Sequence, residues 1–136
     1  MAKNVNTIVV GAGRLGSSIA RLLVKQNNNV LLIDKDKSQF DHVLDYSGFS
    51  EVGDATDLEV LKENGINKAQ RIIVVTDDDN TNIYISDLCL NKTNVKEVYI
   101  RLTDSRKTKI TDKRVKCICP FDLSIDDFTS QMGGEF

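Results

Sequence analysis

Short apolar runs alternate along the chain with segments whose apolar residues recur at helical spacing. This alternation is typical of βαβ units, in which crossover helices join parallel strands. The runs that we expect to form strands are Thr7–Val10, Val30–Ile33, Phe49–Val52, Ile72–Val75, Glu97–Arg101 and Val115–Ile118. Because the first, second and fourth are apolar almost throughout, they should form the centre of a sheet covered on both faces. The pattern therefore predicts an α/β fold with a Rossmann-like, doubly wound, parallel six-stranded sheet in the order 3-2-1-4-5-6.

Amphipathic segments between these runs predict the helices. The first segment places apolar residues at positions i, i+4, i+7 and i+8, and this stripe should pack on the sheet. Its members are Leu15, Ile19, Leu22 and Leu23. The stripe of a weaker second segment, at about residues 38–46, consists of Phe40, Val43 and Leu44. Further helices are expected at about 56–65, 80–90 and 121–132, with a short turn at 105–110.

The helix expected at 56–65 carries signals at both of its ends. Thr56 and Glu59 have the S/T-x-x-E spacing of a capping box, and Gly65 stands where the helix should stop. We therefore expect Thr56 to cap this helix.

The composition is that of one ordinary globular domain. The 136 residues are 40% hydrophobic and 28% charged with a net charge of -2, so we expect residues 1–136 to form one soluble domain. A pI near 5.4 and scattered lysines argue against nucleic-acid binding. No apolar run approaches the ~20 residues that span a bilayer, and no signal-peptide pattern opens the chain, so we expect a cytoplasmic protein. Cys89, Cys117 and Cys119 fit neither a zinc site nor a redox CxxC motif, and are expected to be buried or half-buried thiols.

A G-x-G-x-x-G motif lies between the first expected strand and the first helix, at Gly11, Gly13 and Gly16. In such a motif the first glycine permits a tight turn, the second lets the backbone approach a pyrophosphate, and the third lets helix and strand pack closely. The N–H groups at the helix start then face the phosphates. Glycines also serve ordinary turns, so the surroundings decide. Arg14, inside the motif, is either a phosphate donor or a solvated arginine.

Asp34 ends the second expected strand, about 20 residues after the glycine motif. A carboxylate at this place accepts hydrogen bonds from both hydroxyls of an adenosine ribose. The alternative is a solvent-facing acid at a strand end. If Asp34 binds the ribose, its negative charge would repel a 2′-phosphate, which favours NAD or a simple adenine nucleotide over NADP.

Two further polar loops, at residues 53–56 and 76–80, follow the third and fourth strands. The carboxyl ends of parallel strands share one edge of the sheet, where doubly wound folds bind their ligands. We expect Asp54 to contact the adenine edge and Thr76 to border the crevice. The acids Asp77 to Asp79 have a simpler interpretation as caps of the next helix.

Together these residues resemble the TrkA-N domain, also called the RCK N-terminal domain, of bacterial Trk and Ktr potassium uptake systems. The resemblance rests on residues 10–16, 33–34, 53–56, 73–76 with the acidic loop that follows, and 118–120. The Gly-Asp-Ala-Thr element at 53–56 is its most particular part. The resemblance implies a site for NAD(H) or for AMP, ADP or ATP. The residues that would line it are Gly11, Ala12, Gly13, Arg14, Leu15, Asp34, Lys35, Gly53, Asp54, Ala55, Thr76 and Asp77.

The resemblance also implies a regulatory subunit that works as a dimer, or a ring of dimers, docked beneath a membrane-embedded potassium pore. Two departures limit the comparison. Many members carry a C-terminal RCK domain, whereas this chain stops at Phe136, so we do not expect it to read that domain's signals. Phe121 and Asp122 follow Pro120 where ATP-binding relatives often have an acid, which puts a metal-assisted ATP site in doubt.

Two functions follow from these patterns. The favoured one is a non-catalytic switch in which nucleotide binding gates a transporter, because only His42 is a near-neutral base and it is expected on a solvated helix. The alternative is a stand-alone fragment of an NAD-dependent oxidoreductase, for which neither a substrate domain nor a catalytic pair is evident. A pure adenylate sensor that never binds NAD is a lesser third possibility.

Overall fold

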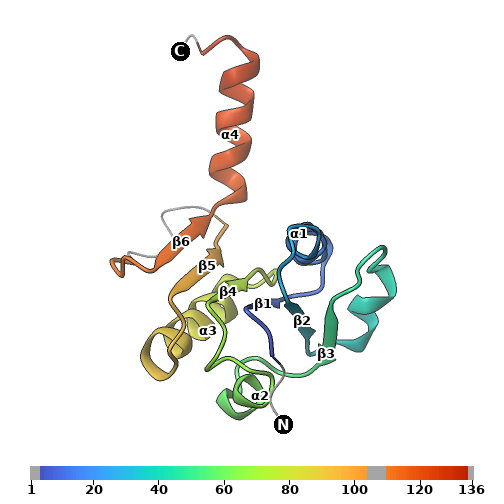
Figure 1. Ribbon diagram of the computed structural model, residues 1–136. Helices are drawn as coiled ribbons and strands as arrows, with labels where there is room; N and C mark the ends of the chain where they lie inside the picture. Colours follow the sequence, from blue (N-terminus) through green and yellow to red (C-terminus); the bar gives the residue numbers. More distant parts are fainter. Residues whose placement is uncertain (1–3, 104–109, 135–136) are drawn as a thin grey trace.

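The protein forms a six-stranded parallel sheet with helices on both faces (Figure 1). The computed structural model describes residues 4–103 and 110–134. The strands are β1 Thr7–Val10, β2 Val30–Asp34, β3 Phe49–Val52, β4 Arg71–Val74, β5 Glu97–Arg101 and β6 Val115–Ile118. They lie in the order β3-β2-β1-β4-β5-β6, and each neighbouring pair is parallel. The predicted fold class and strand order are therefore confirmed, and the strand boundaries agree to within one residue.

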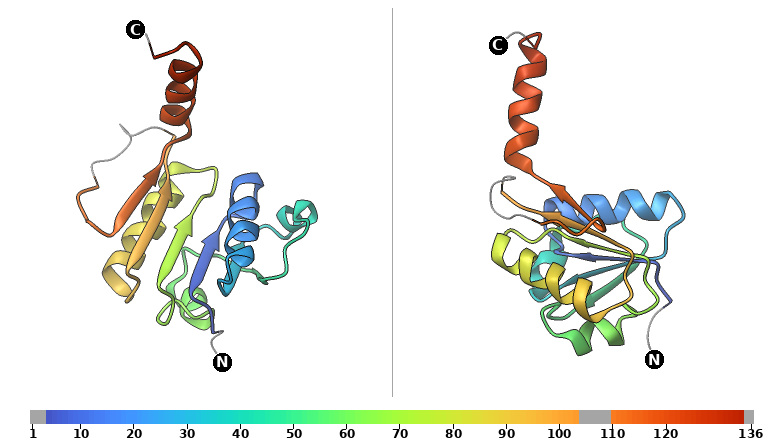
Figure 2. Two further views of the ribbon diagram at one scale, coloured as in Figure 1. Left: turned by 45° about the horizontal axis from the view of Figure 1, so that its top comes forward. Right: turned by 90° about the vertical axis from the view of Figure 1, so that its left-hand side faces the viewer.

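The helices lie between the strands in the order that the periodicity predicts. They are α1 Arg14–Lys25, the 3-10 helix η1 Lys37–His42, α2 Leu58–Glu63, α3 Asp79–Lys92 and α4 Pro120–Gln131. In Figure 2 α1 covers one face of the sheet, and α2 and α3 cover the other. The turn expected at 105–110 falls almost wholly outside the described residues.

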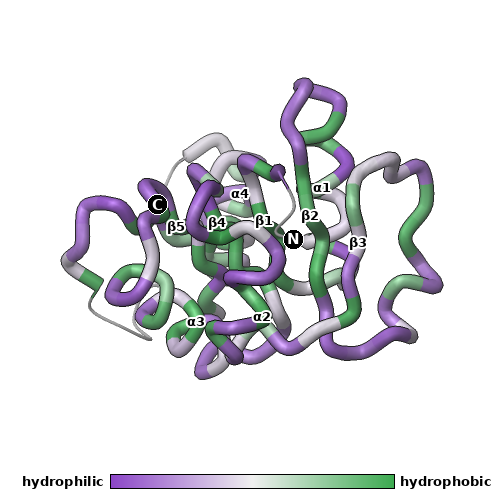
Figure 3. The backbone as a smooth tube through the Cα atoms, turned by 60° about the horizontal axis from the view of Figure 1, so that its bottom comes forward, coloured by the Kyte–Doolittle hydropathy of each residue, from purple (hydrophilic) through white to green (hydrophobic). Residues whose placement is uncertain are grey.

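The core has two layers because successive side chains of a strand point to opposite faces. Ile8, Leu31 and Ile72 belong to the layer under α2 and α3, whereas Val9 and Leu32 belong to the layer under α1. All five are fully buried, as expected for central strands. Figure 3 shows the hydrophobic stretch along β2 and the hydrophilic loops around the sheet.

Small residues form the most deeply buried part of α1, and two members of the predicted stripe, Ile19 and Leu23, pack on the core beside them. Gly16, Ser17 and Ala20 are its buried residues, while Leu15 is 37% and Leu22 55% exposed. The predicted stripe is thus right for Ile19 and Leu23 and wrong for Leu15 and Leu22. The reason is close packing, because a Cβ on Gly16 would lie 1.7 Å from the carbonyl oxygen of Gly11. The helix start therefore sits directly against the first turn, and Leu15 beside it stays exposed.

Asp57, and not Thr56, caps α2. The Asp57 Oδ1 accepts from the Glu59 N–H at 3.0 Å. Thr56 is taken by Asp54, whose Oδ1 accepts from both the Thr56 N–H at 2.9 Å and its Oγ1 hydroxyl at 2.7 Å. This local hydrogen-bonded turn delays the helix start by one residue, which the capping-box spacing alone does not reveal.

The second predicted helix and one predicted thiol also differ from expectation. In place of an α-helix at 38–46 the chain forms only the short η1, which buries no residue completely, and Leu44 is 68% exposed. A stripe of three apolar residues gives too little burial to sustain further turns. Cys89 and Cys119 are buried as predicted, but Cys117 is exposed on β6, an edge strand of the described sheet.

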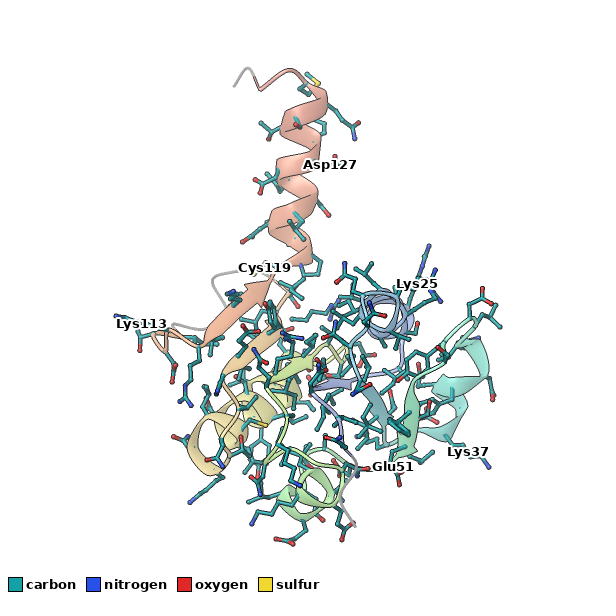
Figure 4. All side chains as sticks on the ribbon, viewed as in Figure 1. Lys25, Lys37, Glu51, Lys113, Cys119 and Asp127 are labelled. Carbon is teal, nitrogen blue, oxygen red and sulfur yellow. The ribbon has the colours of Figure 1, made fainter. Side chains whose placement is uncertain are left out.

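The last helix, α4, stands away from the sheet (Figures 1 and 2). It begins directly after Cys119, and side chains such as Asp127 project from it far from the strands (Figure 4). Its larger apolar side chains and that of Met132 directly after it are about half exposed; those on the helix are Phe121, Leu123, Ile125 and Phe128.

Candidate functional site

A crevice of about 650 Å³ opens at the carboxyl ends of the strands, the edge predicted to bind a ligand. Every site residue expected from the sequence lines it except Ala12: Gly11, Gly13, Arg14, Leu15, Asp34, Lys35, Gly53, Asp54, Ala55, Thr76 and Asp77. The sequence did not suggest Asp36, Gln39, Thr56, Asp78, Thr81 or Arg101, which also line it. Segments far apart in the chain thus meet in one place.

The three glycines of the motif have different structural reasons. Gly11 has φ +108°, a left-handed conformation, and a Cβ there would lie 3.0 Å from backbone atoms of Val75 and Thr76. Gly16 is confined by the Gly11 carbonyl, as described above. Gly13 has an ordinary φ of -70°, and a Cβ there would meet nothing nearer than the Gln39 side chain at 3.9 Å. The fold itself therefore does not require a glycine at position 13.

The N-terminus of α1 opens into this crevice without a compensating side chain. Gly13 is the N-cap residue, which makes no side-chain hydrogen bond, and the first turn of the helix contains no acidic residue. The first N–H groups of a helix lack partners within it and carry the positive end of its dipole. This 12-residue helix thus offers backbone donors to an anion at the surface beside Gly13.

Asp34 is fastened to the glycine loop. Its Oδ2 accepts from the Ala12 N–H at 2.8 Å, and its Oδ1 accepts from the Asp36 N–H at 2.9 Å. Ala12 itself is only 1% exposed, so it contributes this backbone group and not lining surface. A carboxylate has about four acceptor positions, so two hydrogen bonds leave capacity for ribose hydroxyls. Asp34 is half-buried and held in one orientation, unlike a solvent-facing acid.

Asp54 and Asp78 each organise a loop at the rim. The hydrogen bonds from Thr56 lower the pKa of Asp54 below its usual value. Asp78 caps α3 by accepting from the Thr81 N–H at 3.2 Å, and its hydrogen bonds with Thr81 lower its pKa. The capping interpretation of the acidic loop is thus confirmed for Asp78, and both carboxylates are ionised at neutral pH.

Asn82 joins the ends of β4 and β5. Its side-chain Oδ1 accepts from the Thr76 N–H at 3.1 Å and the Thr76 hydroxyl at 2.5 Å. Its Nδ2 donates to the carbonyls of Thr76 at 3.0 Å and Arg101 at 2.9 Å. Asn82 is completely buried. A polar residue on the core-facing side of α3 was the one sequence signal that could have drawn attention to it.

Comparison with known proteins agrees with this fold. The model of the TrkA-N domain family matches residues 7–117. The chain belongs to the TrkA-N domain family. A relative from Pyrococcus abyssi, named Trk system potassium uptake protein TrkA homolog, is 30% identical over 119 residues, which cover 87% of this chain and 52% of the relative. The chain therefore spans about half the length of that protein.

Solved structures share the fold of this TrkA-N domain. The NAD(P)-binding domain of an exopolyphosphatase-related protein from Archaeoglobus fulgidus superposes with a TM-score of 0.77 at 19% identity, over 96% of this chain and 99% of that one. The Kef CTD of Shewanella denitrificans in its AMP-bound form has a TM-score of 0.74 at 21% identity, over 93% of this chain and 78% of that one.

Within the described part of the TrkA-N domain, other kinds of site are not found. No group of three or more His, Cys, Asp or Glu side chains there is arranged to hold a metal ion. None of the helices in that part has the length and apolar character needed to cross a membrane. His42 is exposed at the end of η1 and does not line the crevice.

Proposed function

We propose that this TrkA-N domain binds an adenine nucleotide in the crevice and thereby regulates a potassium uptake transporter. The observation that carries the proposal is Gly13. The backbone there needs no glycine for its own conformation or packing, yet it lies at the uncapped N-terminus of α1 on the crevice wall. Close approach of a phosphate to the backbone explains a missing side chain at this point.

The ligand class follows from Asp34 on the other side of the loop. A carboxylate fixed beside the phosphate-binding backbone suits the two ribose hydroxyls of adenosine and disfavours a 2′-phosphate. NAD(H), AMP, ADP and ATP satisfy both requirements. The related fold that carries AMP in the Kef domain supports this assignment.

A transport role rests on the relatives. Proteins that share this domain are named as Trk potassium uptake proteins, and we propose that this chain likewise serves a potassium-transporting membrane partner on the cytoplasmic side. Occupancy of the crevice would change the balance between two arrangements of the domain, and this shift would reach the transporter. A hydride-transfer enzyme is disfavoured because no near-neutral base lines the described crevice.

A panel of nucleotides tests ligand binding directly. AMP, ADP, ATP and NAD should each raise the melting temperature, because a ligand bound only by the native state adds about 2.7 kcal/mol of stability at a hundred times its Kd. NADP is the matched control, since it differs from NAD only by the 2′-phosphate, and it should give a much smaller shift. Failure of every nucleotide to stabilise the domain would contradict the proposal. Turnover of NAD with small alcohols or carbonyls would favour the oxidoreductase alternative instead.

The assembly is proposed to be a homodimer or a ring of dimers. The apolar surface of α4 stands in solvent in the single chain, as large exposed apolar patches do where proteins associate. Light scattering should show at least a dimer. Ile125, 51% exposed on α4, tests the helix, because Ile125→Glu would place a charge in the interface and shift the mass toward the monomer. Lys25→Glu on α1 is a control that should leave the mass unchanged.

A further inference from the structure

We propose that Arg101 contacts the nucleotide and gives the crevice a preference for ADP and ATP over AMP. The inference rests on the proposed nucleotide site and extends it toward its far end. Arg101 ends β5 and lines the same crevice as the glycine loop and Asp34.

The order of the strands sets how far a ligand must reach. Asp34 ends β2, the glycine loop follows β1, Thr76 follows β4, and Arg101 ends β5. Three strand spacings separate β2 from β5, or about 14 Å at roughly 4.8 Å each. A nucleotide whose ribose lies at Asp34 and whose first phosphate lies over the glycine loop has to extend further to meet Arg101. The Arg101 side chain itself reaches back to the Thr76 carbonyl after β4, and a second phosphate extends the ligand toward it.

A hydrogen bond holds the guanidinium beside the phosphate loop. The Arg101 Nη1 donates to the Thr76 carbonyl at 3.2 Å. The backbone of Thr76 in turn abuts Gly11, where a Cβ would lie 3.0 Å from the Thr76 nitrogen. Arg101 is therefore placed next to the turn that leads into Gly13, with further N–H donors available for a ligand.

The charge of Arg101 is not neutralised by a carboxylate in the described part of the chain. The ion pairs there join Lys62 to Glu59, Arg71 to Glu97, and Arg114 to Asp112. Among the described residues, Arg101 donates to a neutral carbonyl, that of Thr76. A half-buried guanidinium in this setting favours a phosphate, which it binds with charge-assisted hydrogen bonds.

Asn82 acts as the positioning residue for Arg101. It donates to the Arg101 carbonyl and to the Thr76 carbonyl, so both strand ends are fixed to one buried amide. Arg101 closes the arrangement by donating to that same Thr76 carbonyl. Loss of Asn82 would release the guanidinium without removing its charge.

Calorimetry with AMP and ADP in metal-free buffer tests the role of Arg101. Arg101→Gln should weaken ADP binding about tenfold or more, the effect of a lost charged hydrogen bond, and leave AMP affinity within about twofold. Arg21→Gln removes the same charge from α1, whose Arg21 donates to the Leu44 carbonyl outside the crevice, and should change neither affinity. An unchanged ratio of ADP to AMP affinity in Arg101→Gln would overturn the inference while leaving the nucleotide site in place. If the wild type bound neither nucleotide, the proposed function itself would fail.

The same ratio tests Asn82, because a merely structural role would weaken both nucleotides alike. Asn82→Ala should lower the ADP preference, and adding Arg101→Gln should lower it little further, since residues that act as a unit are not additive. If Asn82→Ala does not fold, Asn82→Asp retains the oxygen that accepts from Thr76 and removes both donated bonds. An ADP preference equal to wild type in the folded variant would refute the positioning role.

Discussion

Replacing Gly13 by valine is expected to abolish nucleotide binding and to leave the domain folded. Its φ of -70° is accessible to valine, and a Cβ has 3.9 Å of clearance, so the free energy of unfolding should change by no more than about 1 kcal/mol, the scale of an N-cap substitution. The new side chain would nevertheless stand where a phosphate must approach the backbone. We expect the affinity for AMP to fall about a hundredfold or more, as measured by calorimetry, because several backbone hydrogen bonds to a charged group are lost together.

Gly16 provides the contrasting variant within the same motif. Alanine there would place its Cβ 1.7 Å from the Gly11 carbonyl oxygen, so the start of α1 would have to move away from the turn. Gly16→Ala should therefore lower the melting temperature clearly, although alanine ordinarily stabilises a helix interior. Circular dichroism separates the two effects. If Gly13→Val bound nucleotides with wild-type affinity, the phosphate could not lie at the glycine loop, and the proposed binding mode would be wrong.

The sequence anticipates those parts of the site that depend on one strand and the loop after it. Gly11, Asp34 and Thr76 each follow a recognisable apolar run, and parallel strands necessarily bring such positions to one edge. The glycine pattern likewise reports a local turn. The spacing of the glycines cannot show which of them the fold itself requires. The structure shows that the fold needs Gly11 and Gly16 and does not need Gly13.

The contributions of Asn82 and Arg101 could not be predicted because they depend on contacts between elements. The Asn82 side chain reaches both Thr76 and the Arg101 backbone only after α3 packs across β4 and β5. The position of Asn82 on the core-facing side of α3 could have singled it out, but the local sequence does not reveal which groups it binds. The error at Thr56 has a different, local origin, since the competing acceptor, Asp54, lies two residues before it and just outside the helix signal. Which residues of α1 are buried depends on how closely its backbone approaches the Gly11 turn, and the spacing of apolar residues carries no information about that distance.

The second large effect is expected at Asp34. Asp34→Asn should weaken AMP, ADP, ATP and NAD together by about tenfold to a hundredfold, because hydrogen bonds to a charged group contribute about 1.5–3 kcal/mol each. The asparagine also replaces one acceptor by a donor, so it cannot hold the Ala12 and Asp36 N–H groups at once as the carboxylate does. Loss of the negative charge should at the same time narrow the difference between NAD and NADP, since the repulsion of a 2′-phosphate disappears. Calorimetry with all five nucleotides measures both effects.

Asp41→Asn is the matched control for this experiment. Asp41 is exposed in η1 and does not line the crevice, so the same loss of charge there should change neither the affinities nor the NAD preference. The common loss in Asp34→Asn is diagnostic because the ribose is the part that all these ligands share. A variant that lost NAD but kept AMP at wild-type affinity would move Asp34 away from the adenosine ribose, toward the part of the dinucleotide that AMP lacks.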